Sequence, residues 1–146
     1  LGPNDRRPVI FQSYSAESLT LARQLAPEVP RVLLMGHDDE GKYKKIIEIA
    51  KSVDAFGIGP AGNIFGGDPF SMFSIIWNYP SLVDRAHEAG MVVHTYTMNP
   101  SIAQKLYVGF GVDGFFTDRC DNAVKSFDRP ETKSPDQILD ELGYQK

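Results

Sequence analysis

Two stretches in the second half of the chain decide the fold: MVVHTYTMNP, residues 91–100, and GVDGFFTD, residues 111–118. Both contain runs of β-branched and aromatic residues, which are typical of strands. Asn99 before Pro100 is a helix-start signal, with Asn as the cap and Pro in the first turn, and Gly109 marks the helix end. Together the two stretches predict a strand, a helix and a second strand.

The same alternation recurs toward the N-terminus, where short apolar runs predict strands and helical spacing predicts helices. Strands are expected at 9–12, 32–35, 53–58, 91–98 and 112–117, with helices at about 15–26, 43–50, 80–90, 100–109 and 122–127. The Gly-rich and aromatic stretch 61–77 is expected to be a long loop. Strands that are nearly continuous apolar runs indicate a parallel sheet covered by helices.

Two α/β architectures fit this alternation. One is a flavodoxin-like open sheet of five strands in the order 2-1-3-4-5, and the other is part of a (β/α)8 barrel with strands in sequential order. A whole barrel needs about 250 residues, whereas the chain has 146. Length alone therefore favours the open sheet.

The composition narrows the class of protein. The chain is 42% hydrophobic and 23% charged with a net charge of −4, which is ordinary for a globular domain. No apolar run approaches the roughly 20 residues that span a bilayer. The basic residues are scattered apart from Lys42, Lys44 and Lys45, which disfavours nucleic-acid binding. Cys120 is the single cysteine, so an internal disulfide and a cysteine-rich zinc site are excluded.

Four segments resemble the glycerophosphodiester phosphodiesterase family. Residues 91–99 resemble the seventh strand of that family, and residues 111–118 resemble the eighth, whose pattern is GVDG, two apolar residues and TD. FQSY at 11–14 resembles the end of the fourth strand, and FGIGP at 56–60 resembles the sixth. The Val-Val-His and Gly-Ile-Gly-Pro details resemble the periplasmic bacterial branch.

The resemblance implies an α/β fold, specifically a partial TIM (β/α)8 barrel that contains strands four to eight. Residues 8–127 would form this C-terminal part of the barrel, after a leader or cut loop at 1–7 and before a charged tail at 128–146. The HRG motif, the Glu-x-Asp motif and the second catalytic histidine of the family lie on the first two strands and the loops after them, and a further metal ligand lies on the third. None of these motifs is found in the sequence.

The activity implied by the resemblance is hydrolysis of glycerophosphodiesters, or of lysophospholipids, to an alcohol and glycerol phosphate. In the family a divalent cation, Ca²⁺ or Mg²⁺, holds the phosphate while two histidines act as base or nucleophile and as general acid. The resemblance places those metal ligands and catalytic residues outside this chain, so the 146 residues alone are expected to have negligible activity. The headgroup and the metal stay open, and a secreted or periplasmic location is favoured over a cytoplasmic one.

Barrel enzymes bind their ligands at the carboxyl ends of the strands. This rule selects Gln12, Ser13, Tyr14, Gly59, Pro60, Tyr96, Asn99 and Asp118. The resemblance implies that Tyr96 packs against the glycerol or leaving group and that Asn99 lies near the phosphate, while Gln12, Tyr14 and Asp118 line the same mouth. Each also has a structural interpretation, with Tyr96 in the core and Asn99 and Asp118 as helix caps.

Two further side chains are secondary candidates. His94 lies two residues before Tyr96 on the same strand face, and we interpret it as a buried, hydrogen-bonded histidine rather than a proton-transfer group. Trp77 belongs to an apolar stretch that could shape a headgroup pocket, although core packing is the default. His37 and His87 are expected in solvent, and no nucleophile role is expected for Cys120.

Two alternatives to a phosphodiesterase remain open. A non-catalytic half barrel would associate with a second copy or with an N-terminal barrel half through its open sheet edges. A complete flavodoxin-like domain would bind a small ligand at its strand ends. A sequential strand order would exclude the second alternative. The expected partner otherwise is a small-molecule phosphodiester, with no nucleic acid and no transmembrane segment.

Overall fold

The computed structural model describes residues 9–36, 45–62 and 71–129, together with residues 133, 137, 141 and 143. Five strands and five helices alternate through these residues, as the sequence predicts. In chain order they are β1 (Phe11–Ser13), α1 (Ala16–Leu25), β2 (Arg31–Met35), α2 (Ile46–Ser52), β3 (Gly57–Pro60), α3 (Ser71–Glu88), β4 (Val92–Thr95), α4 (Ser101–Gly109), β5 (Gly114–Phe115) and α5 (Cys120–Ser126). None of the helices in this part of the chain is long and apolar enough to cross a membrane.

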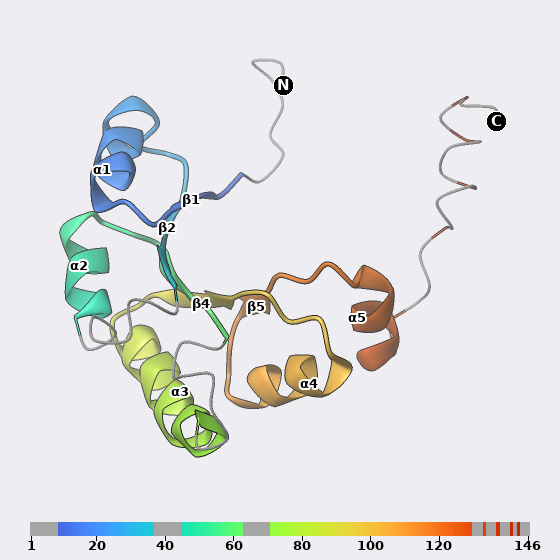
Figure 1. The fold of residues 1–146 in the computed structure, drawn as a ribbon. Helices are drawn as coiled ribbons and strands as arrows, with labels where there is room; N and C mark the ends of the chain where they lie inside the picture. Colours follow the sequence, from blue (N-terminus) through green and yellow to red (C-terminus); the bar gives the residue numbers. More distant parts are fainter. Residues whose placement is uncertain are drawn as a thin grey trace.

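The five strands form one parallel sheet in the order β1-β2-β3-β4-β5. This order contradicts the flavodoxin-like alternative, which needs β1 between β2 and β3. Right-handed crossovers between sequential strands place every helix on the same side of the sheet. Figure 1 shows α1 to α5 lying along the outer side of a curved sheet whose other side is open. The described sheet is therefore an unclosed part of a barrel.

Side chains alternate between the two faces of β4. Val93 and Thr95 are fully buried on the helix side, and the Tyr79 hydroxyl of α3 donates a hydrogen bond to Thr95 Oγ1 over 2.7 Å. Val92 and His94 are half-buried on the opposite face. The helix side therefore holds the hydrophobic core, and the open side holds the residues that a barrel would enclose.

Glycines in β3 allow the neighbouring strands to close over its open face. A Cβ atom built on Gly57 would lie 2.5 Å from the carbonyl oxygen of Val92, and one on Gly59 would lie 2.6 Å from a Leu34 methyl group. A residue without a side chain is needed where backbones approach so closely. Side chains from β2 and β4 consequently fill the space above β3.

The helix α3 differs most from the sequence prediction. It begins at Ser71 and contains Pro80, whereas the sequence predicts a loop up to Trp77 and a helix start at Pro80. Proline lacks one helical donor, but the apolar face around it packs onto the sheet through Tyr79, Leu82 and Val83, which are 0–1% exposed. Tertiary burial outweighs the local preference here. Residues 63–70 of the predicted loop lie outside the described residues.

Candidate functional site

Two tyrosines from distant strands meet at the carboxyl end of the sheet. Tyr14 directly follows β1 and Tyr96 directly follows β4, and their hydroxyl oxygens lie 2.8 Å apart. The rings pack edge to face with centroids 6.4 Å apart. The Tyr96 hydroxyl also donates to the carbonyl oxygen of Met35, at the end of β2, over 2.9 Å. Tyr96 thus reaches across the end of β3 and lies outside the hydrophobic core.

Asn99 and Asp118 form the second pair at this edge. Asn99 Oδ1 accepts hydrogen bonds from the Asp118 backbone N–H over 2.9 Å and from Thr117 Oγ1 over 3.1 Å, and its Nδ2 donates to Asp118 Oδ2 over 3.0 Å. The helix-cap interpretation of both residues is wrong. The N-cap of α4 is Pro100 and that of α5 is Arg119, and in neither helix does a cap side chain accept a hydrogen bond from the first-turn N–H groups.

Gln104 holds the loop that carries Asn99 in place, and the sequence did not predict this role. Its side chain is fully buried, and Nε2 donates to the Met98 carbonyl over 2.9 Å. Met98 N–H in turn donates to the Phe116 carbonyl over 2.8 Å, so the β4–α4 and β5–α5 loops are joined. The available signal was a glutamine three residues before Tyr107, on the apolar face of the predicted helix.

His94 lies on the open face of β4, two residues before Tyr96 in the sequence. Its ring packs edge to face on Phe116 with centroids 6.5 Å apart, and it forms no hydrogen bond within the described residues. The hydrogen bond expected for this histidine is thus not made to any of the residues that the structure describes. Burial lowers the pKa of the imidazole from its ordinary value, against an opposing effect of Asp113. This shift favours the neutral form of the ring.

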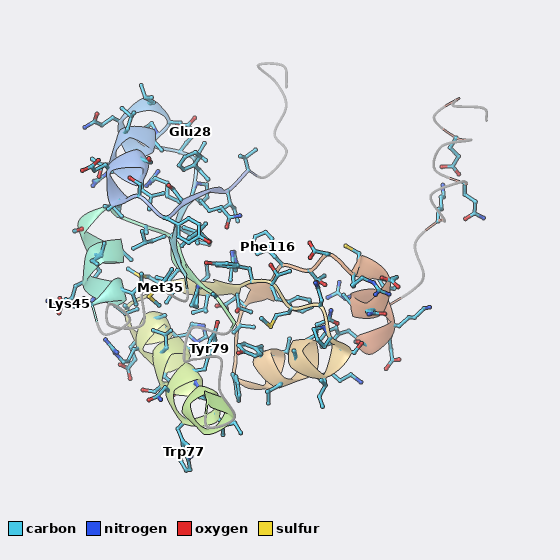
Figure 2. The ribbon with its side chains drawn as sticks, viewed as in Figure 1. Glu28, Met35, Lys45, Trp77, Tyr79 and Phe116 are labelled. Carbon is cyan, nitrogen blue, oxygen red and sulfur yellow. The ribbon has the colours of Figure 1, made fainter. Side chains whose placement is uncertain are left out.

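The remaining candidates lie apart from the two pairs. Gln12 is exposed on β1, in register with Val32. The Pro60 carbonyl accepts a hydrogen bond from buried Thr95, which gives it a structural role. Trp77 is 76% exposed, and Figure 2 shows it pointing away from the sheet on the outer side of α3.

Other predicted side chains have simpler surroundings. Ser13 Oγ accepts from the Ser15 N–H over 3.1 Å and so stabilises the β1–α1 turn. Gly59 leaves room for Leu34, as described above. Cys120 is exposed at the first position of α5. His37 lies outside the described residues.

The described residues do not fit a divalent cation on their own. Ca²⁺ takes six to eight oxygen ligands, and Mg²⁺ takes octahedral oxygen ligands that usually include carboxylates. No group of three His, Cys, Asp or Glu side chains among the described residues could hold an ion. At the carboxyl edge Asp118 supplies a carboxylate, and one of its oxygens is already bonded to Asn99. This part of the chain is suited to contacting a ligand by hydrogen bonds and ring surfaces.

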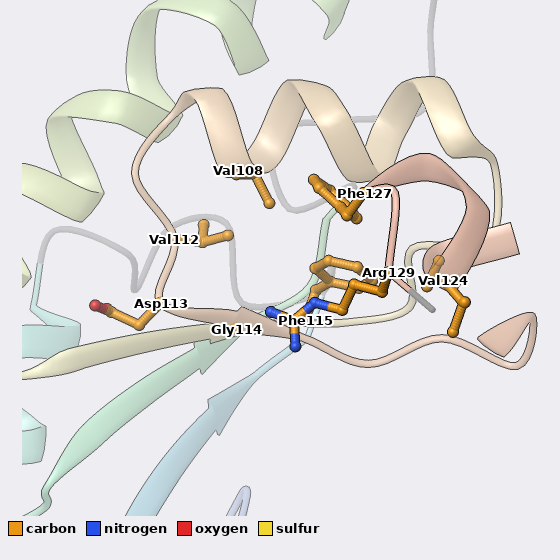
Figure 3. A pocket seen from close by; sticks show the side chains of 9 residues that line it. Val108, Val112, Asp113, Gly114, Phe115, Val124, Phe127 and Arg129 are labelled. Carbon is orange, nitrogen blue, oxygen red and sulfur yellow. The ribbon is translucent and has the colours of Figure 1, made fainter. Parts of the chain in front are cut away.

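A hollow beside β5 lies away from this edge. A cavity of about 600 Å³ lies between α4, β5 and α5 and is lined mainly by apolar side chains, including Val108, Phe115 and Phe127 (Figure 3). Phe115 is in register with Thr95, which faces the helices. The cavity therefore lies on the helix side of the sheet, away from both residue pairs.

Comparison with known proteins finds similarity to one family of phosphodiesterases. A model of the glycerophosphoryl diester phosphodiesterase family matches residues 3–122. Among solved structures, an Oleispira antarctica phosphodiesterase in complex with the product sn-glycerol-3-phosphate has a TM-score of 0.65 and 23% identity, and the alignment covers 86% of this chain and 44% of that one. A search of curated proteins found no match.

Two further structures support the same fold. A glycerophosphoryl diester phosphodiesterase candidate from Agrobacterium tumefaciens has a TM-score of 0.64 at 18% identity, covering 82% of this chain and 44% of that one. One from Silicibacter pomeroyi has a TM-score of 0.62 at 21% identity, covering 80% and 36%. The chain therefore spans between 36% and 44% of the length of these three structures.

Proposed function

Because the chain belongs to the glycerophosphoryl diester phosphodiesterase family, we propose that it forms the ligand-side wall of a site that hydrolyses glycerophosphodiesters or lysophospholipids. One observation carries this proposal. The family match over residues 3–122 includes all the strand ends that bring Tyr14 to Tyr96 and Asn99 to Asp118. These four residues stand at the edge of the sheet where barrel enzymes bind their ligands.

Asp118 is the proposed acceptor for a substrate hydroxyl group. Asn99 orients it by bonding to its Oδ2 and its backbone N–H, while Oδ1 accepts no hydrogen bond from the described residues. An ionised carboxylate only accepts, so it suits the hydroxyl groups of glycerol. A fixed carboxylate at the mouth of the site would thus bind and position the glycerol portion of the diester.

The tyrosine pair is the proposed apolar wall of the same site. The edge-to-face rings of Tyr14 and Tyr96 present flat surface and one accessible hydroxyl group, and Tyr14 is 60% exposed. Such amphipathic rings suit a leaving alcohol that carries both carbon and polar groups. Gln12, exposed on the same strand as Tyr14, is a further candidate for contacting the diester.

Metal binding and proton transfer are proposed to come from residues other than those described. The described residues do not fit Ca²⁺ or Mg²⁺, and His94 has no oriented partner. A bound divalent cation would neutralise charge on the phosphoryl group. The 146 residues alone are therefore expected to bind the ligand weakly and to hydrolyse it negligibly.

The test is to assay the full-length gene product that contains these residues. With Ca²⁺ or Mg²⁺ present, the purified protein should release sn-glycerol 3-phosphate from glycerophosphodiesters, measured by phosphorus NMR or an enzyme-coupled assay. The 146-residue chain, assayed in parallel, should show no release above background. A well-folded full-length product that hydrolyses neither glycerophosphodiesters nor lysophospholipids would overturn the proposal.

A second candidate function rests on the exposed edge of β1. Val9 and Ile10, directly before β1, and Phe11, its first residue, are 49%, 43% and 41% exposed, and within the described residues β1 pairs with β2 alone. An apolar edge strand is a template for pairing with another chain. We therefore keep self-association as an alternative, in which the chain is a non-catalytic half barrel.

A further inference from the structure

The hydroxyl groups of Tyr96 and Tyr14 form a chain with a fixed direction. The carbonyl oxygen of Met35 can only accept, so the single hydroxyl proton of Tyr96 is directed to it. The contact between Tyr96 Oη and Tyr14 Oη, 2.8 Å long, then needs its proton from Tyr14. The order is consequently Tyr14 to Tyr96 to Met35, and it is anchored by a backbone atom that cannot reverse its role.

This direction defines what the outermost oxygen can do. Tyr14 uses its only proton on Tyr96, so its oxygen offers lone pairs and no donor to the space above the strand ends. Tyr14 is 60% exposed, and its hydroxyl accepts no hydrogen bond from the described residues. A ligand group that meets this oxygen must therefore donate a hydrogen bond.

From this geometry we infer that Tyr14 is a specificity-determining residue that selects diesters whose leaving alcohol carries a hydrogen-bond donor, such as a hydroxyl or a primary ammonium group. The inference rests on the proposed function, because that function places the leaving alcohol against the tyrosine pair. A headgroup without a donor, such as trimethylammonium, would exclude solvent from the exposed Tyr14 oxygen and leave that oxygen without a hydrogen-bond donor.

The competing idea is that the two rings act as a cage for a quaternary ammonium group. Aromatic faces attract such cations, and this attraction depends on the rings rather than on the hydroxyl groups. The two ideas therefore differ in whether the hydroxyl oxygen of Tyr14 contributes to the choice of substrate. Replacing Tyr14 by Phe removes the acceptor oxygen and leaves the ring in place.

The test compares two substrates that differ only by three methyl groups on nitrogen, sn-glycero-3-phosphoethanolamine and sn-glycero-3-phosphocholine. In the full-length gene product, the ratio of kcat/KM for ethanolamine over choline should fall about fivefold in Tyr14→Phe, which is the effect of one ordinary hydrogen bond. Tyr96→Phe should lower the ratio as well, because Tyr14 then loses the acceptor that holds its proton away from the ligand.

Tyr79→Phe is the matched control, since it removes a hydroxyl group on the helix side of β4, where it is bonded to Thr95. This variant should leave the ratio unchanged even where it lowers the melting temperature. An active Tyr14→Phe protein whose ratio stays the same or rises would overturn the inference alone. A wild-type protein that hydrolyses neither diester would overturn the proposed function, and this inference with it.

Discussion

Asn99 shows how one short side chain can join two loops. Its amide uses both ends, accepting from the backbone N–H of Asp118 and donating to its carboxylate, and Gln104 holds the preceding carbonyl group in place. The residue therefore acts on the candidate site through Asp118. This makes Asn99 a positioning residue whose effect should be measurable in substrate binding.

Replacing Asn99 by Ala should raise KM for a glycerophosphodiester about tenfold in the full-length gene product, with a smaller effect on kcat. The physical reason is the lost hydrogen bond to a carboxylate, which is stronger than a neutral one. Steady-state kinetics would measure the split between KM and kcat. Asp121→Asn, which alters an exposed pair with Arg119 on α5, is the control and should change neither constant. An unchanged KM in Asn99→Ala would contradict the positioning role.

Asp113 makes stability depend on pH at the opposite end of the sheet. Burial by itself raises the pKa of its carboxyl, but hydrogen bonds from the Val93 N–H, 2.7 Å, and from His87 Nε2, 2.9 Å, outweigh burial and lower the pKa. A carboxyl group with a lowered pKa in the folded state binds fewer protons there than in the unfolded chain. Its stabilising contribution is therefore present above the unfolded pKa of about 3.9 and is lost as pH falls through the folded pKa.

Asp113→Asn should accordingly lower the melting temperature at pH 7, and the difference from wild type should shrink as the pH falls below about 4. Thermal unfolding followed by circular dichroism across this pH range would measure it. Asp84→Asn, on an exposed position of α3, is the control for the loss of one carboxylate, and it should leave the melting temperature at pH 7 close to that of wild type. A difference for Asp113→Asn that stays constant with pH would rule out the charged pairing as its cause.

Among the strands, β3 sets the shape of the open face of the sheet. It carries Gly57 and Gly59 at the positions that face away from the helices, and the space above them is taken by β2 and β4. A strand with side chains at both positions would hold its neighbours further apart. The close approach of these backbones is therefore what allows Tyr96 to reach Met35 across β3.

Gly57→Ala should reduce the free energy of unfolding by about 2 kcal/mol, since the new methyl group meets a backbone oxygen that cannot rotate away. Urea unfolding would measure the change. Gly109→Ala at the end of α4 is a matched control, because nothing lies within 4 Å of the added carbon and alanine favours helix. A Gly57→Ala protein as stable as wild type would show that the approach of β4 to β3 is not tight.

The unclosed sheet is the feature that bears on the second candidate function, self-association. The described β1 edge is apolar, and Phe116 on the open side of β5, visible in Figure 2, is 44% exposed. A closed barrel has no strand edges, whereas a partial one must leave two. The 146-residue chain is therefore expected to gain mass with concentration.

Sedimentation of the 146-residue chain should show this association, and Phe11→Lys should weaken it by placing a charge on the β1 edge. Ile102→Lys is the control, because Ile102 is 80% exposed on α4, away from either edge, and its replacement should leave the association unchanged. A chain that stays monomeric over the accessible concentrations would contradict the self-associating half barrel.

The site could be predicted from sequence only as a set of strand ends. Placing ligands at the carboxyl ends of parallel strands selected Tyr14, Tyr96, Asn99 and Asp118, and the structure brings these four together as two pairs. The pairings themselves could not be predicted, since Tyr14 and Tyr96 are 82 residues apart and meet only through the sheet. Their roles in binding, the metal, the periplasmic-type branch and the cellular location stay predictions.

By itself, the sequence determined the alternation of strands and helices and the family, because both depend on local patterns such as MVVHTYTMNP and GVDGFFTD. Tertiary structure alone decided which strand-end side chains pair, the helix that continues through Pro80, and the burial of Gln104. Each of these depends on contacts between segments far apart in the chain, whose burial energy outweighs local propensity. The direction of the Tyr14–Tyr96–Met35 hydrogen bonds belongs with them, since it exists only after β1, β2 and β4 have assembled.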